Sequence, residues 1–170
     1  NGARNIFPDA FERYVSVIPP EERGDLVAAF HKRLISPERE VRLAAARAWA
    51  RWEGETISIA GPSALPSRFN DDRFAEAFAR IENHYFVNRG FFENDGWLLD
   101  QAARLRHIPC HVAHGRYDMC TPLASAWALK QAWPEAELAI IPDAGHSSLE
   151  PGIVDALVRA TDAMLARAHW

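Results

Sequence analysis

Two short polar segments in the second half of the chain contain a carboxylate and an imidazole that could carry out proton transfer. Asp118 ends the segment His-Gly-Arg-Tyr-Asp, and His146 ends the later segment Pro-Asp-Ala-Gly-His. A histidine can accept the proton of a serine hydroxyl, and a carboxylate can orient that histidine and stabilise its charged form. The pair therefore predicts acyl-transfer chemistry in which His146 is the general base and Asp118 positions it.

Each of these residues alone also has an ordinary interpretation, since Asp118 could cap the turn before Pro122 and His146 could be a loop histidine. Together, an acid followed by a histidine is the order found in catalytic triads of α/β-hydrolases, where the serine comes first, on a G-x-S-x-G turn. That motif does not occur in the sequence, and the chain begins with Asn rather than Met. We therefore expect a truncated chain whose nucleophilic serine lies upstream.

The segments around Asp118 and His146 alternate between strand and helix patterns. Short apolar runs at 108–114 and 138–141 predict strands, and amphipathic stretches at 122–133, with Thr121 as its cap, and from Pro151 onward predict helices. Alternating units of this kind form a parallel sheet covered by helices. Because ligands gather at the carboxyl ends of such strands, both polar segments are expected at a functional edge.

The first 106 residues predict helices joined by polar breaks. Apolar positions recur at helical spacing over 26–34 and 41–52, with Gly54 as the stop of the second helix, and again over 74–85, after a cap at Asp71 or Asp72. A further helix is expected over 95–105, and a loop rich in Gly, Pro and Ser over 61–67. The second of these helices should bury two tryptophans. The change of pattern places a domain boundary near residue 106.

Composition excludes several classes of function. The 170 residues carry 19 Lys and Arg against 23 Asp and Glu, a net charge of −4, which disfavours nucleic acid and anionic membranes as partners. No apolar stretch is long enough to span a bilayer, no secretory signal is recognisable, and two cysteines are too few for a disulfide framework. The expected location is therefore the cytoplasm.

A metal site is not expected among the histidines near the first strand. Cys110 and His114 should face one side of that strand and His111 the other, so that together with His107 these residues do not converge.

Six segments, distributed along the chain, resemble the proline iminopeptidase (prolyl aminopeptidase) family. They are IFPDA (6–10), EERGD (21–25), AWARWEG (48–54), RIENHYF (80–86), HGRYD (114–118) and PDAGH (142–146). The resemblance implies a serine peptidase of the α/β-hydrolase fold that releases N-terminal proline from peptides without a cofactor. It further implies that residues 1–106 form a helical cap with the return to the core, and that residues 107–170 form the last part of the core.

The resemblance also implies a role for two glutamates, Glu53 and Glu82. From sequence alone a glutamate on a helix is most often a solvated surface charge. In the resembled family these positions bind the protonated substrate amine, for which carboxylates in a partly desolvated site are suited. Two alternatives stay open: another capped α/β-hydrolase, such as an esterase or epoxide hydrolase, and a non-catalytic helical interaction module. The isolated chain is expected to be inactive.

Overall fold

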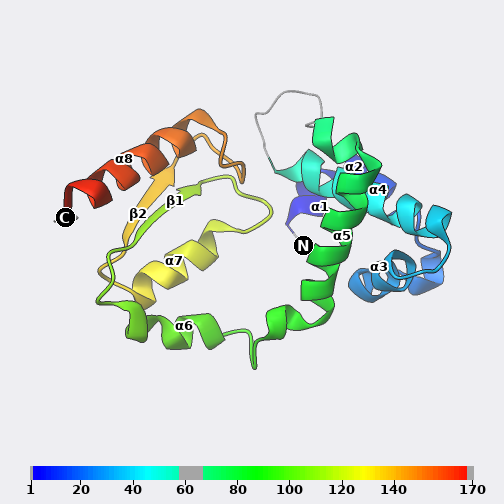
Figure 1. Cartoon of the computed structure of the whole chain (residues 1–170), viewed down its shortest axis with the longest axis horizontal. Coiled ribbons are helices and arrows are strands. Elements are labelled where there is room, and N and C mark those ends of the chain that lie inside the picture. The colour runs from blue at the N-terminus through cyan, green and yellow to red at the C-terminus, as the bar shows by residue number, and fades with distance from the viewer. Residues whose placement is uncertain (1, 58–66, 168–170) are drawn as a thin grey trace. The chain divides into compact units, whose positions relative to one another are not determined.

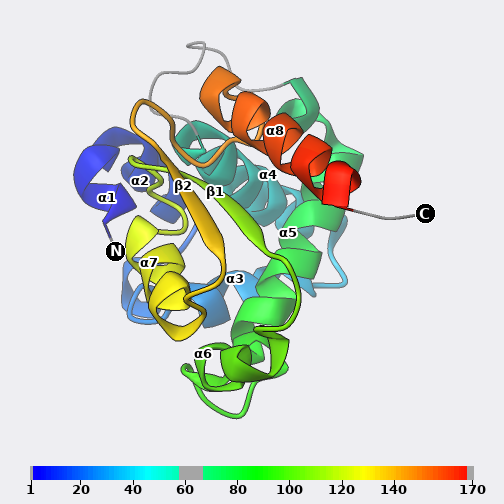
Figure 2. The same ribbon diagram turned by 90° about the vertical axis from the view of Figure 1, so that its left-hand side faces the viewer.

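The computed structural model describes residues 2–57 and 67–167 and contains two compact units (Figures 1 and 2). One unit runs to Thr56 and includes a later stretch that ends at Glu93, and the other includes Ile57 and the chain from Asn94 onward. The domain boundary expected near residue 106 stays a prediction. Most of the loop expected at 61–67 lies outside the described residues. No helix in the described ranges is both long and apolar enough for a membrane span.

The first unit is helical. Its α-helices are α1 (Ala3–Ile6), α2 (Pro8–Val15), α3 (Leu26–Leu34), α4 (Arg39–Thr56) and α5 (Asp72–Val87), and its short 3-10 helices are η1 (Pro20–Glu22), η2 (Ser67–Asn70) and η3 (Arg89–Phe91). The helices α3, α4 and α5 pack against one another, and α2 packs on α4.

Local capping explains where several of these helices begin. The carboxylate of Asp71 accepts a hydrogen bond from the amide of Phe74 at 2.7 Å, which confirms a cap at this position, and Asp25 caps α3 through the amide of Ala28. The predicted stop at Gly54 is wrong, because α4 continues to Thr56. Helices tolerate a single glycine, and the hydroxyl of Thr56 donates to the carbonyl of Trp52 within the last turn.

Aromatic side chains fill the interior of the first unit. Tyr14 stacks on Phe30 with ring centroids 4.5 Å apart, and Trp49 meets Phe30 edge to face at 5.2 Å. Trp49 is 2% exposed, whereas Trp52 is only half-buried and stacks against Tyr14. The expected burial of two tryptophans therefore holds fully for one of them. This packing fixes the face of α4 from which Glu53 projects.

The second unit contains the sheet. Its elements are α6 (Trp97–Gln101), η4 (Ala102–Leu105), β1 (His111–Gly115), α7 (Leu123–Ala132), β2 (Glu137–Ile141) and α8 (Pro151–Arg167). The strands are parallel, with His111 opposite Glu137 and Gly115 opposite Ile141. Helix α7 covers one face of this sheet and α8 the other (Figures 1 and 2). The predicted strand–helix–strand–helix order is thus confirmed, but the helix expected over 95–105 divides into α6 and η4.

Candidate active site

The end of β1 turns sharply and leaves Asp118 buried. The amide of Arg116 donates to the carbonyl of Ile141, at the end of β2, and the amide of Tyr117 donates to the carbonyl of Ala144. These backbone bonds tie the turn after β1 to the loop after β2. Asp118, at the end of the turn, is only 5% exposed.

Asp118 and His146, the predicted acid and base, are in direct contact. The imidazole Nδ1 of His146 lies 2.9 Å from Oδ2 of Asp118. The other carboxylate oxygen, Oδ1, accepts hydrogen bonds from the amides of Cys120 and Thr121 at 3.0 and 2.8 Å. Burial opposes ionisation of Asp118, but the hydrogen bonds from Thr121 and His146 outweigh it and hold its pKa below the ordinary value. Asp118 is therefore an anion suited to orient an imidazole.

Thr121 has a different role from the one that its sequence position suggests. A Thr-Pro pair before a helix predicts a side-chain cap, but no side-chain cap bond forms at the start of α7. Instead the Thr121 hydroxyl donates to Oδ2 of Asp118 at 2.8 Å and lies 3.2 Å from Nδ1 of His146. The carbonyl of Thr121 accepts a hydrogen bond from Nε2 of His114 at 2.9 Å. Sequence reasoning missed this contact of Thr121 with the acid and the imidazole.

The loop that holds His146 approaches β1 very closely. A Cβ atom at Gly115 would stand 2.0 Å from the carbonyl oxygen of Gly145 and 2.5 Å from that of Ala144, so only glycine fits there. The amide of Gly145 donates to the carboxylate of Glu150, and the amide of His146 donates to the carbonyl of Ile57 at 2.9 Å. The backbone of the loop is thus held on several sides. The His146 side chain remains 40% exposed, so a second reacting group can approach the imidazole.

Glu53 and Glu82 belong to the first unit, on α4 and α5. The indole Nε1 of Trp49 donates to Oε2 of Glu82 at 2.7 Å. Burial, and secondarily the negative charge of Glu82, raise the pKa of Glu53 to about 8. Burial and these same two carboxylates also raise the pKa of Tyr14. The two glutamates are therefore partly desolvated and electrostatically coupled, unlike ordinary surface carboxylates.

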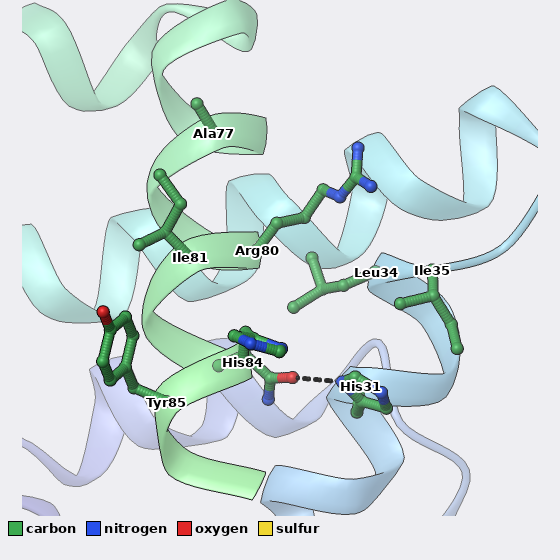
Figure 3. Close-up of a pocket in the computed structure, with 9 residues that line it drawn as sticks. His31, Leu34, Ile35, Ala77, Arg80, Ile81, His84 and Tyr85 are labelled. Carbon is green, nitrogen blue, oxygen red and sulfur yellow. Dashed lines mark hydrogen bonds between the residues drawn. The ribbon is translucent and has the colours of Figure 1, made fainter. Parts of the chain in front are cut away.

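A groove of about 470 Å³ lies between α3 and α5, apart from both glutamates (Figure 3). In Figure 3 the Arg80 side chain leaves α5 on the side where Leu34 and Ile35 lie, and its guanidinium is 3.6 Å from the carboxylate of Glu76, one turn earlier on α5. Asn83 lines the groove from α5 and is only 1% exposed. It accepts a hydrogen bond from Nδ1 of His31 at 2.9 Å and donates one to the carbonyl of Val27, so it links α5 to α3. Neither Glu53 nor Glu82 lines the groove, so it is a separate feature of the helical unit.

Within the described ranges, three metal-ligating side chains come together at one place. The ligand atoms of Asp118, Cys120 and His146 all lie within 4.8 Å of one another. Cys120 follows Asp118 by two residues, and sequence reasoning gave it no role. Of the histidines near β1, His111 faces Glu137 across the sheet with a closest approach of 3.4 Å, whereas Nε2 of His114 lies 3.6 Å from Oδ2 of Asp118.

Comparisons with known proteins show which proteins this chain is similar to. Residues 1–152 match the model of the α/β-hydrolase fold family. The chain is 53% identical to a probable proline iminopeptidase of Leptolyngbya boryana over 98% of this chain and 52% of that protein. It is 55% identical to a proline iminopeptidase of Xanthomonas citri over 95% of this chain and 51% of that protein. It is 52% identical to one of Arabidopsis thaliana over 97% of this chain and 44% of that protein. The chain spans about half the length of the curated relatives that it matches.

Proposed function

This chain belongs to the α/β-hydrolase fold family, and on that premise we propose that it is the acid- and base-bearing part of a serine aminopeptidase. The enzyme releases the N-terminal proline of peptides. The observation that supports this most directly is the 2.9 Å contact between Asp118 and His146, which are held at the ends of two parallel strands. The similarity to proline iminopeptidases over nearly the whole chain supports the choice of substrate.

The reaction uses His146 first as a base and then as an acid. Its Nδ1–H faces Asp118, so the lone pair of Nε2 accepts the proton of a serine hydroxyl as the serine oxygen attacks the prolyl carbonyl carbon. The resulting imidazolium then gives this proton to the leaving amine, the carbon–nitrogen bond breaks, and an acyl-enzyme is left. Water, deprotonated in turn by His146, attacks the acyl carbon, the imidazolium returns the proton to the serine oxygen as the ester bond breaks, and proline is released. The serine is supplied by a segment upstream of residue 1.

The glutamates bind the positively charged amine of the substrate. Burial keeps Glu53 largely protonated at neutral pH, while Glu82 is oriented by the indole of Trp49. A prolyl ammonium group brings a positive charge next to Glu53. This charge stabilises the carboxylate, so binding of the substrate amine favours ionisation of Glu53. Hydrogen bonds between such charged groups are strong where water is excluded. Peptides with a blocked N-terminus therefore bind poorly.

The test is hydrolysis of proline 4-nitroanilide by this chain and by a form extended upstream to include a G-x-S-x-G segment. Activity in the extended form alone supports the proposal. An aryl ester and an epoxide serve as competing substrates, because an esterase or an epoxide hydrolase would prefer them.

Variants of the extended form test the part played by the cap glutamates. Selective loss of prolyl activity in Glu53→Gln and Glu82→Gln is expected, and unchanged selectivity in both variants would contradict the substrate assignment. Activity on none of the substrates would favour a non-catalytic interaction module.

A further inference from the structure

The second unit combines three different metal-binding groups at the site of the acid and the base. Asp118 offers a carboxylate oxygen, Cys120 a thiol sulfur and His146 an imidazole nitrogen, and these atoms lie within 4.8 Å of one another. We propose that Asp118, Cys120 and His146 form an inhibitory binding site for a thiophilic divalent cation such as Zn²⁺. This inference goes beyond the proposed hydrolysis, which needs no metal, and concerns regulation of the same site.

The chemistry of the three donors selects the cation. Zinc sites that keep a position open for water or ligand commonly have three protein ligands drawn from Cys, His and Asp or Glu, and bond lengths near 2.0–2.3 Å. Donor atoms at such distances from one ion are separated by about 3–4 Å, so atoms that already lie within 4.8 Å need to move only about 1 Å. Mg²⁺ and Ca²⁺ prefer oxygen ligands only and should bind weakly here.

The contact between His146 and Asp118 identifies the nitrogen that binds the cation. Nδ1 is the nitrogen that faces Asp118, at 2.9 Å from Oδ2, so a cation coordinated by both residues takes the place of the proton between them. The neutral imidazole keeps its one proton by shifting it to Nε2. Cys120 binds as a thiolate and gives its proton to solvent, so each ion bound releases one proton overall.

This proton shift explains why the bound ion inhibits. The mechanism proposed above requires a lone pair on Nε2 of His146, and that nitrogen carries a proton when the cation occupies Nδ1. The cation also separates the imidazole from the Thr121 hydroxyl, which lies 3.2 Å from Nδ1 in the metal-free arrangement. Binding thus removes the general base without covering the rest of the site.

The chain provides a matched control for the test, because its two cysteines, Cys110 and Cys120, are both reduced and both partly buried. Co²⁺ is used as a spectroscopic probe and Zn²⁺ as a competitor, titrated into the tag-free full chain and into Cys120→Ser and Cys110→Ser. We expect a sulfur-to-cobalt charge-transfer band in the unsubstituted chain and in Cys110→Ser that is lost in Cys120→Ser. Calorimetry should show Zn²⁺ binding at least tenfold weaker in Cys120→Ser, with one proton released per Zn²⁺ in the unsubstituted chain.

Other results would overturn the proposal: no saturable binding, a charge-transfer band that depends on Cys110, or equal competition by Mg²⁺. Circular dichroism of the two variants identifies any loss of fold, in which case Cys120→Ala replaces the serine variant. A second arm measures zinc inhibition of prolyl nitroanilide hydrolysis in the extended form, each variant against its own zinc-free rate. If that form has no peptidase activity, the binding arm still decides whether the site exists.

Discussion

The Thr121 hydroxyl donates a hydrogen bond to Oδ2 of Asp118, the same oxygen that accepts the hydrogen bond of His146. The hydroxyl also lies 3.2 Å from the imidazole Nδ1, so one side chain contacts both members of the proposed acid–base pair. Two backbone amides hold the opposite carboxylate oxygen. Asp118 is therefore fixed in orientation from both sides, and the hydroxyl is the only one of these supports that a substitution can remove without changing the backbone.

Replacing Thr121 by valine should lower kcat for prolyl substrates and leave KM nearly unchanged. Valine keeps the shape of the side chain but removes a hydrogen bond to a charged group, worth ~1.5 kcal/mol or more, which corresponds to a decrease in kcat of about tenfold or more. Thr121→Ser restores the hydroxyl and should recover most of the rate. Equal kcat in the valine variant would mean that the backbone amides alone position Asp118.

Glu53→Gln should make the folded chain more stable, and increasingly so as pH rises. The pKa of Glu53 is raised from 4.5 to about 8 by burial and by Glu82, so the folded state retains a proton that the unfolded state loses between these values. Stability of the unsubstituted chain therefore falls through that window, by an amount on the order of a few kcal/mol, and glutamine avoids the loss. Denaturant unfolding at about pH 5 and about pH 9 measures the difference.

The control for this measurement is Glu21→Gln, which changes an exposed carboxyl in η1. It measures how removal of one carboxyl from the surface changes the free energy of unfolding at the same two pH values. Parallel pH dependence of the Glu53→Gln variant and the unsubstituted chain would show that Glu53 is ionised at neutral pH in the folded state.

Gly115→Ala should destabilise the second unit strongly. The added Cβ would overlap the carbonyl oxygens of Gly145 and Ala144, both of which are backbone atoms and cannot rotate away. We expect a loss of at least ~3 kcal/mol, together with displacement of the loop that holds His146. Gly24→Ala is the matched control, since a Cβ there meets no atom within 4 Å. Similar unfolding midpoints for the two variants would contradict the close approach.

Trp49→Phe should raise KM for prolyl substrates more than it lowers kcat. Phenylalanine retains an aromatic ring in the core but lacks the Nε1–H that orients Glu82 at 2.7 Å. Because Glu82 is assigned to amine binding rather than to bond breaking, its loss of orientation affects ground-state and transition-state binding alike. Trp52→Phe changes the other tryptophan of α4 and is the reference. A decrease confined to kcat would argue against this assignment.

Sequence periodicity was sufficient to locate α3, α4, α5, α7, α8 and both strands, because their buried faces follow regular spacing, but it did not single out α2. The helix boundaries were less accurate: α4 passes through Gly54, and the expected helix over 95–105 divides in two. In both cases the local helix propensity of the residues was too weak to determine where the helix ends, because contacts with the surrounding structure override it.

The order of Asp118 and His146 along the chain indicated that the two residues would meet, since the carboxyl ends of neighbouring parallel strands share one edge. Sequence could not reveal the contacts of Thr121, Cys120 and Glu150. Each of these contacts depends on how a turn directs a side chain in three dimensions. The sequence around Thr121 is equally consistent with a helix cap. Interactions of this kind carry no periodic signal.

The hydrogen bond between Trp49 and Glu82 makes the fluorescence of Trp49 sensitive to the position of the Glu82 carboxylate. Indole emission responds to charge near the ring, and the carboxylate of Glu82 touches the indole nitrogen directly. A prolyl ammonium group that draws this carboxylate away from the indole should therefore change the emission of Trp49, and no added dye is needed. Proline and prolyl peptides could then be ranked by titration alone, with binding recorded separately from turnover.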